Sequence, residues 1–194
     1  MYMPAYHREN DPARLDALIR TRPLGLLVTG GPAGLLANPI PFLLDAERGE
    51  HGTLIAHMAR ANPHWREADG SREALVVFQD VDSYITPAWY ATKRETGKVV
   101  PTWNYATVHA WGPMRAIEDA DWLRNQVGQL TDIHEASREN RWAVSDAPDD
   151  FVAMQLRAIV GIEIPIARIE GKWKVSQNRP EADRAGVVEG LREH

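Results

Sequence analysis

Residues 57–65, HMARANPHW, combine an arginine with the start signal of a helix. Asn62 is a favoured helix N-cap, and Pro63 suits the first helical position. Arg60 therefore stands just before a helix N-terminus, where free N–H groups and partial positive charge attract anions. This pattern predicts an anion site suited to a phosphate group. The alternative is that Arg60 is a solvated loop residue and that Asn62 is only a cap.

Residues 35–42, LLANPIPF, place two prolines two positions apart in an expected strand. Both missing N–H groups then lie on the same side of the strand, so no neighbour pairs normally there. That side is an edge or an opening, and Asn38 points near it. At an opening a ligand could use the remaining backbone groups, whereas at an edge Pro39 and Pro41 would protect against aggregation. The sequence leaves both alternatives open.

A third segment, residues 84–112, concentrates aromatic and polar side chains. Its Thr-Trp-Asn-Tyr run contains Trp103 and Asn104, and Lys93 precedes that run. A core strand does not need this composition, whereas a pocket for a flat ligand would use it. The alternative is that the seven tryptophans of the chain fill the core and a dimer interface.

The stretch KWKVSQNRPEADRAGVVEGL, near the end of the chain, gathers hydrogen-bonding side chains where chains are usually loosely specified. Gln177, Asn178 and Arg179 follow one another just before a proline, which is expected to open the last helix. One interpretation is that the three side chains reach a ligand. The other is that they pin the helix, by capping and by a pair between Asp183 and Arg184.

The composition excludes several kinds of site. There is no cysteine, so disulfides, thiolate catalysis and cysteine-bound metals are absent, and the chain suits a reducing cytoplasm. The histidine spacing matches no zinc signature, so no metal site is expected. Neither a phosphate-binding P-loop nor a nucleophile elbow occurs. No apolar run approaches the roughly 18–20 residues of a membrane span.

Runs of apolar and β-branched residues predict a series of strands, most of them arranged as hairpins. The first two are joined by a turn at GGPAG (30–34), and Glu170-Gly171 is expected to be a two-residue turn between the last strand and KWKVS (172–176). The expected strands cover residues 23–29, 35–44, 52–59, 73–79, 83–86, 104–118 and 159–169.

Helices are expected after Asp11, at 119–137, at 149–158 and after Pro180. Strands and helices do not alternate in a βαβ rhythm. The pattern therefore predicts a mainly β fold with flanking helices, in which an antiparallel sheet closes into a barrel. No linker divides the chain, so a single domain over residues 1–194 is expected.

Three motifs together resemble the PaiB-like family of FMN-binding negative transcriptional regulators. They are WYATK, VPTWNYATVHAWG and KWKVSQNRPEADRAGVVEGL, and the resemblance covers nearly the whole chain. It implies the FMN-binding split barrel, as in pyridoxamine phosphate oxidases, and a homodimer whose two subunits form the flavin site between them.

The resemblance also implies roles for individual residues. Arg60 with Asn62 corresponds to the phosphate end, and Asn38 with Pro39 would lie along the flavin ring or ribityl chain. The run after the last strand would reach the flavin across the dimer interface, with Arg179 as the positive group near N1–O2. The remaining candidates for binding the cofactor are Trp103 and Asn104, as walls of the site, together with His57, Lys93, Gln177 and Asn178.

The family name implies regulation of transcription, but the charge of the chain does not support direct DNA binding. The net charge is −5, and no basic recognition helix is present. A partner or a patch formed by the dimer would have to contact the DNA. The alternative function is a flavin oxidoreductase that takes electrons from a reduced nicotinamide. A third reading is haem binding on the same barrel, with His57 or His109 as axial ligand.

Overall fold

The computed structural model describes residues 1–31, 34–67 and 69–193. These residues form two compact units. We call the first the terminal unit, because it contains both chain ends, and the second the barrel unit. The terminal unit comprises residues 1–18, 79–108 and 170–193, and the barrel unit comprises residues 19–78 and 109–169. The single-domain organisation stays a prediction.

Antiparallel strands close a barrel, as the sequence predicted. Their order around the barrel is β7 (Thr102–Ile117), β5 (Asp69–Gln79), β2 (Leu24–Gly31), β3 (Gly34–Asp45), β4 (Thr53–Ala59) and β8 (Ile159–Pro165). The pairing of Arg115 with Glu163 joins β8 to β7 and closes the ring. Apolar side chains alternate inward along the strands, so Leu27, Leu54 and Val76 are fully buried in the barrel core.

The expected hairpin of the first two strands is confirmed. β2 and β3 pair from Leu24↔Pro41 to Gly31↔Gly34. Residues 32–33 of the expected GGPAG turn lie outside the described residues. The hairpin places Asn38 opposite the fully buried Leu27, which puts its side chain on the inner face of the barrel.

The helices of the barrel unit are α3 (Ala120–Glu135) and α4 (Asp149–Arg157), with 3₁₀ segments at Pro63–Glu67 and Val144–Asp146. Asp119 caps α3, because its carboxylate accepts a hydrogen bond from the Trp122 N–H at 2.8 Å. Leu123 of α3 packs with Val152 and Leu156 of α4 in a small core of their own. Both helices were expected from the sequence, α3 from the spacing of its apolar residues.

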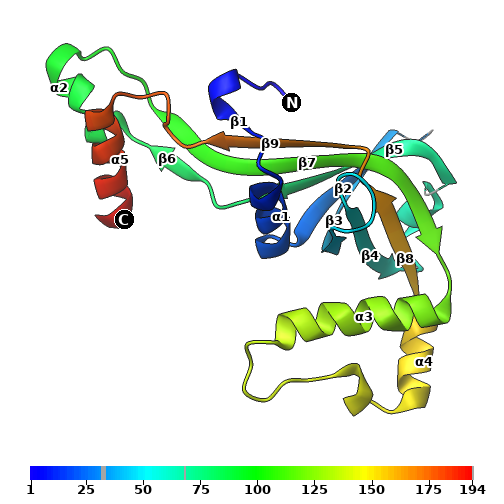
Figure 1. The fold of residues 1–194 in the computed structure, drawn as a ribbon. Helices are drawn as coiled ribbons and strands as arrows, with labels where there is room; N and C mark the ends of the chain where they lie inside the picture. Colours follow the sequence, from blue (N-terminus) through cyan, green and yellow to red (C-terminus); the bar gives the residue numbers. More distant parts are fainter. Residues whose placement is uncertain (32–33, 68, 194) are drawn as a thin grey trace. The chain divides into compact units, whose positions relative to one another are not determined.

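The terminal unit is built on a smaller sheet. Its strands are β1 (Arg8–Glu9), the greater part of β9 (Arg168–Lys174), the first half of β7 and β6 (Ser83–Ile85). Figure 1 shows β9 lying along β7, with α5 (Glu181–Glu193) next to α2 (Ala91–Thr96). The remaining helical elements begin or flank this unit: α1 (Pro12–Thr21) and 3₁₀ segments at Ala5–His7 and Pro87–Trp89.

The expected turn at Glu170-Gly171 is wrong. Both residues lie inside β9, where Gly171 pairs with Glu9 of β1. β8 ends at Pro165, and it pairs with β4 and β7 rather than with β9. Gly171 is needed for close packing, because a Cβ there would lie 2.2 Å from a methyl carbon of Leu15. In the sequence, Gly171 was interpreted as part of a turn, whereas in the structure it makes room for a side chain of α1.

No helix in the described part of the chain is long and apolar enough to cross a membrane.

Candidate functional site

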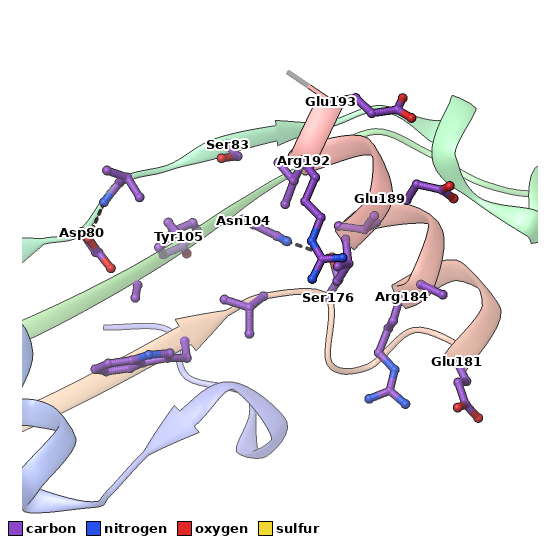
Figure 2. A pocket seen from close by; sticks show the side chains of 18 residues that line it. Asp80, Ser83, Asn104, Tyr105, Ser176, Glu181, Arg184, Glu189, Arg192 and Glu193 are labelled. Atoms are coloured by element: carbon purple, nitrogen blue, oxygen red, sulfur yellow. Dashed lines mark hydrogen bonds between the residues drawn. The ribbon is translucent and has the colours of Figure 1, made fainter.

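A pocket of about 970 Å³ lies in the terminal unit between α5 and the strands β6, β7 and β9. We call it the α5 pocket. Figure 2 shows carboxylates and guanidinium groups from α5 around it. Its charged lining is mixed in sign, with Asp80, Glu181, Arg184, Glu189, Arg192 and Glu193. Of the residues predicted to bind a cofactor, Asn104 is among those that line it.

Ser176 lies at the edge of this pocket in a strained conformation. Its φ of 63° is in the left-handed region, which non-glycine residues rarely occupy. The hydroxyl of Ser176 is buried and donates a hydrogen bond to Oδ1 of Asn104 at 3.0 Å, drawn as a dashed line in Figure 2. This bond ties the loop after β9 to β7. Strain of this kind is held by surrounding structure and often marks functional loops.

Two side chains of the predicted run 177–179 make contacts that stabilise the loop after β9. The Gln177 amide donates to the carbonyl of Trp173 and accepts from the N–H of Val175 at 2.8 Å. The Arg179 guanidinium stacks over the ring of Tyr90, 4.7 Å from its centre. Asn178 is exposed. Among the described residues, Gln177 and Arg179 thus contact their own unit without capping α5, and Asp183 accepts the Thr92 N–H rather than pairing with Arg184. The flavin role of the three side chains stays a prediction.

The two residues expected to wall the site point in opposite directions. Trp103 and Asn104 are neighbours in β7, so their side chains lie on opposite faces of the sheet. Trp103 is 53% exposed and makes an edge-on contact with Tyr84 of β6, with ring centres 5.8 Å apart. Lys93 is exposed on α2, where no side-chain hydrogen bond or ion pair joins it to another described residue.

The face that Trp103 shares with Tyr105 also carries two lysines that were not among the predicted site residues. The Nζ atoms of Lys172 and Lys174 lie 5.2 and 6.0 Å from the ring centre of Tyr105. Lys174 Nζ also donates to the hydroxyl of Thr102 and to the carbonyl of Trp103. The pKa of Lys174 is lowered, mainly because its ammonium is partly buried. The charges of Lys172 and Arg179 lower this pKa further, while the interaction with Tyr105 opposes the shift.

His7 completes a cluster with these lysines, which we call the cationic cluster: His7, Lys172 and Lys174. His7 is buried, and burial is the main cause that lowers its pKa. A hydrogen bond with Gln177 opposes this shift, and the two lysines add to it. The signal for the lysines was visible in the sequence as Lys-Trp-Lys, because alternation along a strand places both on one face.

In the barrel unit, the predicted residues Asn38 and Asn62 meet at a histidine. His64 is buried, and its Nδ1 accepts a hydrogen bond from the Asn38 amide at 2.8 Å. Its Nε2 then carries the proton, and it lies 2.8 Å from the hydroxyl of Thr29. The Asn62 side chain caps the following turn by accepting the His64 N–H at 3.0 Å. The helix expected there is a 3₁₀ segment of five residues.

The part of β3 that contains Pro39 and Pro41 does not pair with β4. Phe42 donates its N–H to Pro23 on the β2 side, so the missing N–H groups of Pro39 and Pro41 belong on the β4 side. The pairing of β3 with β4 begins only at Phe42. Pro39 points outward while Asn38 points inward, so the two side chains lie on opposite faces of the strand.

Arg60 is engaged within the chain. Its guanidinium bonds to the carboxylate of Glu118 and to the carbonyls of Arg157 and Ile159. A phosphate would have to take the place of Glu118 on this side chain, so the phosphate role of Arg60 stays a prediction. His57 Nδ1 bonds to the side chain of Gln126 at 2.7 Å. The described residues hold no group of three or more His, Asp or Glu side chains suited to a metal.

Comparison with known proteins identifies the family. Residues 1–168 match the family model described as "Putative FMN-binding domain". An uncharacterized protein of Emericella nidulans is 37% identical over 98% of this chain and 90% of its own length. The Bacillus subtilis protein named "Protease synthase and sporulation protein PAI 2" is 29% identical over 98% of this chain and 89% of its own length.

Solved structures share the fold. The flavocytochrome Anf3 of Azotobacter vinelandii matches with a TM-score of 0.67 at 14% identity, over 95% of this chain and 78% of that chain. The "FAD and Heme binding protein" of Mycobacterium smegmatis matches with a TM-score of 0.64 at 20% identity, over 95% and 80%. The predicted fold is confirmed, and the chain belongs to the PaiB-like family of FMN-binding domain proteins.

Proposed function

We propose that the protein binds FMN. The observation that carries the proposal is the match of residues 1–168 to an FMN-binding domain. The terminal unit supplies side chains that fit a flat, negatively charged group: the exposed Trp103, the Tyr105 ring and two lysines beside it. When bound, FMN would supply the redox chemistry, and the protein would orient the ring and set the charge around it.

We assign the two ends of FMN to residues of different kinds. Arg60 and Asn62 are the proposed phosphate ligands, with Asn38, Pro39 and His57 as further candidates in the barrel unit. Trp103 and Asn104 are proposed to contact the ring, with Lys93, Gln177, Asn178 and Arg179 as further candidates in the terminal unit. Because Trp103 and Asn104 point to opposite faces of β7 within one chain, a single flavin ring would contact one of them directly.

A homodimer is proposed from the family. The outer face of the β2–β3 hairpin supports it, because Leu24 and Leu26 are 65% and 40% exposed there and Pro39 stands opposite Leu26. Exposed apolar side chains in a row are typical of a surface that another protein covers. Light scattering of the purified protein would measure the mass directly, and a monomer at all concentrations would refute the dimer.

Negative regulation of transcription is the proposed biological role, and it rests on the family alone. The charge of −5 makes strong binding to phosphates by the bare chain unexpected. Operator binding that weakens with rising salt would support the role. The absence of binding to any promoter fragment at low salt would remove direct DNA contact from the proposal.

An FMN-dependent oxidoreductase is the second candidate, and haem binding is a third. The flavocytochrome and the FAD- and haem-binding protein share the fold, which makes both chemistries relevant tests. Reduction of the bound flavin by a reduced nicotinamide would support the enzyme. The two histidines suggested as haem ligands already have partners. His57 forms a hydrogen bond with Gln126, and the ring centre of His109 lies 5.5 Å from that of Trp111. To bind iron, each histidine would have to give up this contact.

The deciding experiment is an absorbance spectrum of protein purified without added cofactor, followed by chromatography of the released ligand. A flavin spectrum with released FMN is the expected result, and a Soret band would favour haem. Arg60→Ala should lower FMN affinity about tenfold or more, because a charged hydrogen bond to phosphate is lost. Arg94→Ala, on the exposed side of α2, is the matched control. A colourless protein that takes up no FMN would refute the proposal.

A further inference from the structure

Lys172 of the terminal unit is a buried positive charge that forms no ion pair with a carboxylate of the described residues. We propose that the cationic cluster, together with Tyr105 and Trp103, binds the negatively charged edge of a planar aromatic ligand. The inference rests on the proposed binding of FMN and goes further, because it assigns the ring end of the flavin to Lys172 and Lys174. Neither lysine was a candidate from the sequence, and Arg179 was expected to fill this role.

Lys172 is the centre of the argument. It is 8% exposed, and its ammonium lies 5.2 Å from the Tyr105 ring centre and 5.9 Å from that of Tyr2. Among the described residues, no hydrogen bond or ion pair joins the Lys172 side chain to another group. Ring faces compensate a buried ammonium only in part, since burying a charge without a partner is costly. An anionic ligand would supply the missing partner.

Lys174 has the same imbalance, and His7 adds a buried nitrogen without a partner. Lys174 donates to two neutral acceptors, a hydroxyl and a carbonyl, and His7 Nδ1 is buried with no hydrogen-bond partner among the described residues. The nearest acidic side chain along β9, Glu170, binds the N-terminal ammonium at 2.8 Å. Burial, with a smaller contribution from the neighbouring positive charges, lowers the pKa values of His7 and Lys174, which agrees with a partly dry site.

The shape of this face favours a flat ligand over a spherical anion. Trp103 and Tyr105 alternate along β7 and therefore project from the same face, beside Lys172 and Lys174, which alternate along β9. Tyr84 continues the aromatic row from β6, where it pairs with Trp103. A row of rings next to a row of cations would stack a planar ligand and hold negative charge at its edge.

Arg179 is less suited to this role than the lysines. Its guanidinium stacks on Tyr90, and its backbone N–H bonds to Ser176 at 2.9 Å. The α5 pocket is also less suited, because its lining carries four carboxylates against two guanidinium groups. The cationic cluster is thus the place in the terminal unit where the described charges call for an anion.

The first test compares FMN with riboflavin, which lacks the phosphate. Lys172→Met and Lys174→Met should each weaken binding of both flavins about tenfold, because each removes one charged contact to the ring. Both variants should also raise the pH at which N3 of the bound flavin loses its proton, since nearby cations favour the anion. Lys98→Met, an exposed lysine of the same unit, is the matched control and should leave both quantities unchanged.

The outcomes separate this inference from the proposed function. Wild-type flavin affinity and an unchanged N3 ionisation in both variants would overturn the inference while FMN binding stands. Weaker binding of FMN but not of riboflavin would show that the cluster holds the phosphate, which also overturns it. Lys172→Arg should retain most of the affinity, because it keeps the charge, and unfolding curves would confirm that each variant is folded.

A second probe does not depend on flavin. Naphthalene-2-sulfonate is a planar aromatic anion, and its binding can be followed by quenching of tryptophan fluorescence, with Trp103 on the same face. Binding that is lost in Lys172→Met but kept in Lys98→Met would support the anion site even if the protein takes up no FMN. No binding of either probe by the wild type would refute both this inference and the proposed function.

Discussion

The polar groups around His64 and Arg60 in the barrel unit find partners within the chain, whereas two groups of the cationic cluster in the terminal unit, the Lys172 ammonium and His7 Nδ1, have none among the described residues. In the barrel unit, both ring nitrogens of His64 are hydrogen-bonded, and Arg60 bonds to Glu118 and two carbonyls. In the terminal unit, the Lys172 ammonium lies beside the rings of Tyr2 and Tyr105 without a hydrogen bond or ion pair to another described residue, and His7 Nδ1 has no described partner. A closed network specifies structure, while an incomplete one marks a place that a ligand can complete.

The largest expected effect is in the closed network. His64→Ala should lower the free energy of unfolding by about 3–5 kcal/mol, because it leaves a cavity and removes the partners of Thr29 and Asn38. Denaturant unfolding measures this value. A loss below about 1 kcal/mol would mean that the network does not hold the barrel end, and the contrast between the two units would fail.

Next in size is a pair of glycine substitutions in one helix of each unit. A Cβ on Gly186 of α5 would lie 2.0 Å from the backbone oxygen of Trp89, whereas a Cβ on Gly128 of α3 meets nothing within 4 Å. Gly186→Ala should therefore cost about 1–3 kcal/mol of stability through overpacking. Gly128→Ala should add about 0.5–1 kcal/mol through helix propensity. Thermal unfolding of both variants compares them, and equal effects would contradict the packing of α5 on Trp89.

A smaller change in the free energy of unfolding, a gain instead of a loss, is expected when Lys172 of the cationic cluster is replaced. In the absence of ligand, Lys172→Met should leave stability unchanged or raise it by up to about 2 kcal/mol, because it removes an unpaired buried charge and keeps the apolar stem. The variant should nevertheless bind flavin less tightly. A strong loss of stability in the ligand-free protein would show that Lys172 has a structural partner and would erase the contrast with His64.

The smallest effect concerns pH. Burial lowers the pKa of His7 in the folded state, so the unfolded chain takes up a proton first as the pH falls below the ordinary value of 6.5. Wild-type stability should therefore fall more between about pH 7.5 and pH 5 than that of His7→Gln, which has no proton to take up. Unfolding at both pH values tests this. Parallel curves for the two proteins would mean that His7 is not held neutral in the folded state.

Much of the fold was predictable because local patterns and tertiary packing agree. Alternation predicted the strands of the barrel, and Asp119 predicted the start of α3 by its side chain. The exception was Gly171, for which a turn and a tight packing site give the same sequence signal. The segment after Asn62 was also only partly predicted, because a cap and a proline do not fix the length of a helix.

The candidate site was less predictable. The sequence pointed to Trp103, Asn104, Gln177 and Arg179 by residue type, yet Gln177 and Arg179 make their contacts within their own unit. The Lys-Trp-Lys alternation placed Lys172 and Lys174 on one face, but only the pairing of β9 with β1 and β7 shows that they lie next to aromatic rings and that Lys172 is buried. Residue type indicates what a side chain can do, but its partners depend on distant segments.

The sequence by itself determined the periodicity of the strands, the helix starts, the absence of cysteine chemistry and the resemblance to an FMN-binding family. These features depend on neighbouring residues, whose spacing along the chain is fixed by backbone geometry. The tertiary structure alone decided which polar groups find partners. Lys172 lies far along the chain from Tyr2 and Tyr105, and whether its charge is balanced depends on which strands are brought beside β9.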